Sequence, residues 1–177
     1  MKLEDAFYHM HLLLLGINDG YDEWLDHYLE TEAPLSDIVL ELSLCGSDTN
    51  KTVSLLHNYC AAQRFDESVS HDKLRLFFKK AYHSDRMTKE EVLSTMYRLA
   101  LNIGEPGIFD TRLWGSMYFL SYYYGLAEEG GIPWGNFDFA FLSYLDDGTP
   151  IDTDRIWKRP IKRKESPFSR LKSIFRR

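Results

Sequence analysis

Hydrophobic residues recur at spacings of three and four positions through most of the chain, which is the spacing that places them on one face of an α-helix. This pattern predicts helices over residues 3–15, 21–31, 51–63, about 66–83 and about 88–103. Thr88 followed by Glu91 matches a capping box, and Asp66 or Ser70 is expected to cap the helix before it. The sequence therefore indicates a mainly α protein with six or seven helices joined by short loops.

Segment 109–127, FDTRLWGSMYFLSYYYGLA, carries apolar or aromatic residues on nearly every side of the helix that it predicts. Asp110 is expected to cap its start, and Gly125 with the pair Gly130-Gly131 to end it. A helix that is apolar all round is normally enclosed by other helices. The segment is too short and too rich in Tyr, Ser and Arg to span a membrane. We therefore expect a compact domain built around this central aromatic-rich helix.

Two segments fit a helix and a strand about equally well. In residues 35–45, apolar positions at helical spacing coexist with an alternation from Ile38 to Leu44. The helical neighbours favour a helix there. In residues 137–145, Phe137, Phe139 and Phe141 alternate with other residues as in a strand, while helical spacing is present as well. Minor strand content near 137–145 is left open.

Composition limits the kind of protein this can be. A chain of 177 residues that is 44% hydrophobic and 15% aromatic is long and apolar enough for one folded domain, or one domain with an appendage. Its two cysteines, Cys45 and Cys60, are too few for a disulfide scaffold and lie on apolar helix faces. The first residues contain no signal-peptide core. The expected location is therefore cytoplasmic, with no membrane span.

Charge is divided unevenly between the body and the tail. Residues 1–154 hold 11 Lys and Arg against 26 Asp and Glu, whereas residues 155–177 hold 10 against 1. We therefore distinguish an acidic helical domain, 1–154, from a basic amphipathic tail, 155–177. Such a division says more about binding partners than about the fold.

Helix 21–31 carries the most concentrated negative charge. Asp22, Asp26 and Glu30 are spaced four apart, with Glu23 beside them and no Lys or Arg in the segment. Like charges at this spacing destabilise a helix by about 0.2–0.5 kcal/mol per pair. These residues form either a solvated face that keeps the protein soluble, a docking surface for a basic partner, or a site for the protein's own basic tail.

No catalytic or metal-binding motif is present. The chain has no HExxH, no paired CxxC, no G-x-S-x-G and no glycine-rich phosphate loop. We therefore predict no enzymatic activity, no metal and no cofactor. Hydrolysis by a pair of the many carboxylates is the remaining enzymatic alternative.

The size, acidic body, helical make-up and missing active site resemble the immunity proteins of bacterial contact-dependent growth-inhibition systems. The stretches NKTVSLLHNYCAAQRFDE and LWGSMYFLSYYYGLAEEGG are similar in character to that class, and the likeness covers about residues 1–150. The resemblance implies a protein that binds one cognate toxin domain, often a nuclease, and blocks its activity. The basic tail departs from the class.

A nuclease presents a basic cleft for phosphates, and a rigid acidic surface is able to occupy that cleft. We therefore predict that the protein neutralises a basic toxin and does not itself bind nucleic acid. The expected partner-binding residues are Asp22, Glu23, Asp26, Glu30 and Trp134. A central anchor is expected among Trp24, Tyr28 and Trp134, with Trp24 favoured as a core residue. The alternative is an adaptor that attaches to anionic membrane or nucleic acid through its tail. Self-association is left open.

Overall fold

The computed structural model describes residues 1–64, 66–104 and 113–158. Within these ranges the chain forms helices and no strands, which confirms the mainly α prediction. The helices are α1 (Leu3–Leu14), α2 (Tyr21–Thr31), α3 (Asp37–Ser43), α4 (Thr49–Ala61), α5 (Glu67–His83), α6 (Lys89–Ile103), α7 (Trp114–Glu128), α8 (Trp134–Asp147) and α9 (Thr153–Ile156).

Capping residues set several helix starts, as the sequence predicted. The side chain of Asp66 accepts a hydrogen bond from the Ser68 amide at the start of α5. Thr88 and Glu91 form a complete capping box at the start of α6. These bonds satisfy amides that have no partner inside their own helix.

Both ambiguous segments are helical. Segment 35–45 contains α3, in which Val39 and Leu42 are buried. Segment 137–145 lies within α8, and the strand alternative is not formed there. Four large side chains of α8 share one fully buried face at helical spacing: Phe137, Phe141, Tyr144 and Leu145. A strand would have turned some of these side chains away from the core.

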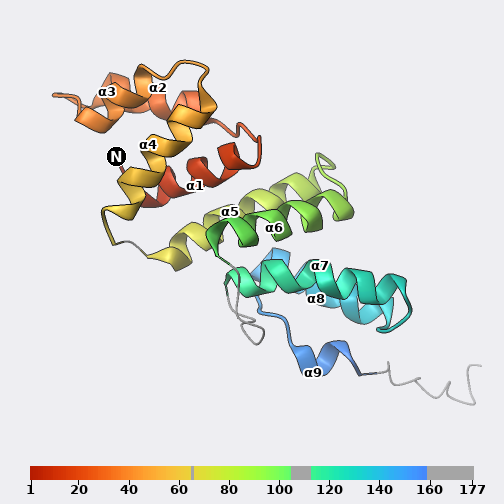
Figure 1. Ribbon diagram of the computed structural model, residues 1–177. Coiled ribbons are helices and arrows are strands. Elements are labelled where there is room, and N and C mark those ends of the chain that lie inside the picture. Colours follow the sequence, from red (N-terminus) through yellow and green to blue (C-terminus); the bar gives the residue numbers. More distant parts are fainter. Residues whose placement is uncertain (65, 105–112, 159–177) are drawn as a thin grey trace, which may run out of the picture.

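The helices lie in successive groups (Figure 1): α1 to α4 at one end, α5 and α6 in the middle, and α7 to α9 at the other end. Helix α5 contacts α1, α6 and α8, so it joins the two ends. Helix α7 packs against α6 and α8. Its buried residues, which include Trp114, Met117 and Leu120, follow one side, and Tyr122 on another side is 55% exposed. Among the described residues, α6 and α8 therefore cover this aromatic helix on two sides, and Tyr122 remains exposed. The expected cap, Asp110, lies outside the described residues.

Residues at the start of the predicted tail pack on the body. Ile156 is buried in the core, and the guanidinium of Arg155 lies 3.8 Å from the ring centre of Phe139 on α8. The rest of the tail, residues 159–177, lies outside the described residues.

Two histidines of α1 are buried, and they make the stability of the fold sensitive to acid. Burial lowers the pKa of His9 to about 4, and burial together with nearby His57 lowers the pKa of His11 to about 4. In an unfolded chain a histidine has a pKa of about 6.5. Between these values the unfolded state binds more protons than the folded state, so the free energy of unfolding falls as the pH falls from about 6.5 to about 4.

We expect His11→Gln to reduce this loss of stability. Between about pH 7.5 and pH 5, the free energy of unfolding of the variant should fall by about 1–2 kcal/mol less than that of the native chain. The reason is that one buried titrating group is gone. Denaturant unfolding at both pH values measures the difference. The control variant Asn58→Gln, at an exposed position on α4 that carries no titrating group, should keep the native pH dependence. Equal pH dependence in the native chain and His11→Gln would contradict the assignment.

Candidate protein-interaction surface

Helix α2 presents its acidic residues to solvent. The side chain of Asn18 accepts a hydrogen bond from the Tyr21 amide at 3.1 Å, and it donates one to Asp22 at 3.0 Å. Both bonds stabilise the first turn of α2. Tyr21 and Leu25 face the core. The other side of the helix exposes Asp22, Glu23, Asp26 and Glu30. The structure thus places these four predicted residues on one exposed helix.

The negative charge of this face is not neutralised within the described part of the chain. Some carboxylates elsewhere do have partners: Asp5 pairs with Lys73 across α1 and α5, and Asp146 lies 3.3 Å from Lys79. Among the described residues, none of the four acidic side chains of α2 forms an ion pair. The negative electrostatic potential of the four carboxylates therefore extends into solvent, where it acts on any approaching charged molecule.

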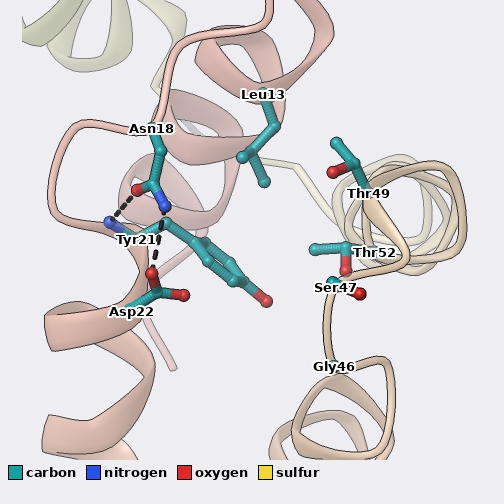
Figure 2. Close-up of a pocket in the computed structure, with 8 residues that line it drawn as sticks. All are labelled: Leu13, Asn18, Tyr21, Asp22, Gly46, Ser47, Thr49 and Thr52. Carbon is teal, nitrogen blue, oxygen red and sulfur yellow. Dashed lines mark hydrogen bonds between the residues drawn. The ribbon is translucent and has the colours of Figure 1, made fainter.

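A pocket of about 420 Å³ opens beside the first turn of α2. Figure 2 shows its two walls, one from the end of α1 and the start of α2, the other from the turn before α4 and its first residues. The lining residues are Leu13, Asn18, Tyr21, Asp22, Gly46, Ser47, Thr49 and Thr52. The walls meet because α1 and α4 pack in opposite directions, with the end of α1 next to the start of α4.

The Tyr21 side chain points from the α2 wall across the pocket toward the opposite wall (Figure 2), and its hydroxyl lies near Thr52. That hydroxyl is buried and makes no well-formed hydrogen bond with the described residues. Burial raises the pKa of Tyr21 to about 12, and the Thr52 hydroxyl partly opposes the rise. Tyr21 is therefore a neutral phenol at physiological pH, able to donate one hydrogen bond and to accept others.

Two exposed leucines, one on α3 and one just past its end, add apolar surface on the helix next to α2. Helix α3 packs beside α2, and it exposes 43% of Leu40; Leu44, just past its end, is 77% exposed. Val39 and Leu42, which lie at helical spacing in this segment, are buried. Leu40 and Leu44 were not predicted as binding residues. The sequence could have indicated their exposure, because a helix that buries Leu42 turns the side chains two positions before and after it toward the opposite side.

The structure does not bring Trp134 together with the acidic residues of α2. Trp134 begins α8, is 44% exposed and contacts the rings of Tyr124 and Phe137. Helices α2 and α8 are separated by α1, α5 and α6 (Figure 1). Trp24 and Tyr28, the other candidate anchors, are partly buried against the core, and the Trp24 ring lies 4.6 Å from that of His9.

Cys60 is not activated as a nucleophile, and the described residues form no metal-binding cluster. Cys45 and Cys60 are buried free thiols, as predicted, and burial raises the pKa of Cys60 to about 11. A thiol with such a pKa is protonated and a poor nucleophile. Within the described ranges, no group of three or more His, Cys, Asp and Glu side chains is arranged to hold a metal ion. None of the described helices combines the length and apolarity needed to cross a membrane.

Comparison of this chain with known proteins identifies no relative. A scan against protein-family models, a search of curated proteins and a search of solved structures each found no match to this chain.

Proposed function

We propose that this protein binds a basic protein partner through the acidic face of α2 and inhibits it. The partner is a toxin domain, a nuclease by the resemblance to immunity proteins described above. The observation that carries the proposal is the exposed, unpaired charge of Asp22, Glu23, Asp26 and Glu30. Some acidic groups elsewhere, such as Asp5 and Asp146, are paired with lysines from other helices, whereas α2 carries four exposed carboxylates with no ion-pair partner among the described residues.

Charge complementarity explains how such a surface selects its partner. A nuclease cleft that binds phosphates is lined by Lys and Arg side chains. A rigid helix with four exposed carboxylates is attracted to that cleft and is not a substrate for it. Opposite fields also accelerate encounter and disfavour acidic partners.

Electrostatic attraction accelerates encounter, but a tight complex also requires apolar contact at the centre of the interface. Leu40 and Leu44 supply exposed aliphatic side chains on the helix next to α2. They replace Trp134 as the proposed anchors, because Trp134 lies at the far end of the molecule. The proposed interface therefore combines the acidic face of α2 with the exposed leucines of α3.

Co-expression tests the proposal. Any toxin domain encoded next to the gene of this protein is expressed with and without the chain, and growth and nucleic-acid integrity are measured. The full chain should restore growth and protect nucleic acid, and the purified proteins should form a one-to-one complex. A toxin that kills cells equally with and without the chain would contradict the proposal.

Truncation separates this proposal from the adaptor alternative. A chain ending after Lys158 lacks most of the basic tail and keeps the described body. Protection should be unchanged in this truncated chain. Loss of protection, together with loss of binding to anionic vesicles or RNA, would instead support an adaptor that acts through its tail.

A further inference from the structure

The pocket beside α2 is lined by oxygen-bearing side chains and contains no basic residue among its described lining. Hydroxyls come from Tyr21, Ser47, Thr49 and Thr52, and a carboxylate comes from Asp22. Its volume of about 420 Å³ lies within the range of pockets that hold small ligands. The chemistry of the walls therefore suits a group that donates several hydrogen bonds and carries positive charge.

The Tyr21 hydroxyl is a buried polar group in this pocket that lacks a hydrogen-bond partner among the described residues. The side chain is 7% exposed, and its oxygen has no well-formed hydrogen bond. The neighbouring Thr52 hydroxyl donates its one proton to the Asp48 carbonyl oxygen at 3.0 Å, so it is not able to donate to the Tyr21 oxygen. A buried oxygen that accepts no hydrogen bond destabilises the structure, so a donor placed in the pocket would remove that penalty.

Charge at the pocket favours a cation over an anion. One carboxylate oxygen of Asp22 accepts from Asn18, which leaves the other oxygen available. The start of α4 also borders the pocket, and a helix start normally favours anions. Here, however, the Asp48 carboxylate caps α4 and accepts the Lys51 amide at 3.0 Å, so an acidic group already occupies that position.

We infer that this pocket receives the side chain of an arginine from the basic partner. The inference rests on the proposed function and specifies its contact. A guanidinium is planar, remains charged, and offers five N–H donors that reach acceptors on different walls at once. Asp22 pairs with its charge, and the hydroxyl oxygens of Tyr21, Ser47 and Thr49 accept its remaining hydrogen bonds. A lysine ammonium has only three donors on one nitrogen and contacts fewer of these groups.

The test uses N-propylguanidinium as the probe, with N-propylurea as its neutral counterpart of similar shape. Each is titrated into the isotope-labelled full chain at low salt, and amide resonances are followed by NMR. N-propylguanidinium should shift the amides of Ser47 and Thr49 with an affinity of about 1 mM, as expected for a ligand of this size. N-propylurea should cause much smaller shifts at the same concentrations.

Two substitutions on α2 locate the binding site. Asp22→Asn should weaken N-propylguanidinium binding about five-fold, because it removes the pairing charge. Glu30→Gln, which lowers the charge of the same helix away from the pocket, should leave the affinity unchanged. Equal binding of both probes, or equal weakening by the two substitutions, would overturn the inference, since either result means that the pocket does not select a guanidinium.

The outcome is separable from that of the proposed function. Probe binding in the pocket, combined with absence of toxin protection, would support the guanidinium site and reject the immunity role. Protection without probe binding would support the immunity role and reject the arginine contact.

Discussion

Replacing Asp22, Asp26 and Glu30 together by lysine is expected to weaken the complex with the toxin by at least about 100-fold at low ionic strength. Each substitution changes an attraction to a repulsion against a basic cleft. The three side chains are exposed and have no ion-pair partner among the described residues, so their removal should leave the fold intact. Calorimetric titration measures the affinity, and far-ultraviolet circular dichroism checks the helix content.

Salt dependence gives the second readout of this experiment. The affinity of the native chain should fall steeply between about 50 and about 500 mM salt, whereas that of the triple variant should change little. The matched control carries lysine at Glu128, Glu129 and Asp147, three exposed acids at the other end of the molecule, so its net charge is the same. The control should keep near-native affinity. Equal weakening by both variants would mean that total charge matters and α2 does not.

Arg75→Ala is expected to lower the free energy of unfolding by about 3 kcal/mol. The guanidinium of Arg75 is almost fully buried between α5 and α8, where Nη1 donates to the Leu145 carbonyl oxygen at 2.6 Å and Nε lies 3.3 Å from Asp72. The contacted carbonyl belongs to the last turn of α8, whose carbonyls have no partners within the helix. Alanine would leave that carbonyl unsatisfied and a cavity beside it.

The side chain of Arg75 packs closely against Gly148 at the end of α8. This glycine ends α8 with φ +69°, a conformation that favours glycine, and a Cβ there would lie 3.1 Å from Arg75 Nε. Denaturant unfolding of Arg75→Ala measures the loss. The control, Arg98→Ala at an exposed position of α6, should change stability by no more than about 0.5 kcal/mol. Similar stability of the two variants would show that the Arg75 contacts are not important for the fold.

The sequence was sufficient where the determining interactions are local. Helical periodicity and capping residues predicted α1, α2, α5 and α6 closely, because helix hydrogen bonds and caps join residues within about four positions of one another. The concentration of negative charge on 21–31 was likewise evident from spacing alone. For α3 and α8 the local pattern fitted two structures, and only burial against other helices decided between them.

Which segments distant in the sequence lie close together could be determined only from the tertiary structure. Trp134 and the acidic residues of α2 looked equally suitable for one interface, yet the packing of α1, α5 and α6 holds them apart. Conversely, Asn18 and Asp22 share a pocket with Ser47 and Thr49 only because α1 packs antiparallel to α4. The sequence by itself thus determined the helices and the sign of the charge on α2. The pocket and the exposed leucines depend on long-range packing, which spacing along the chain does not encode.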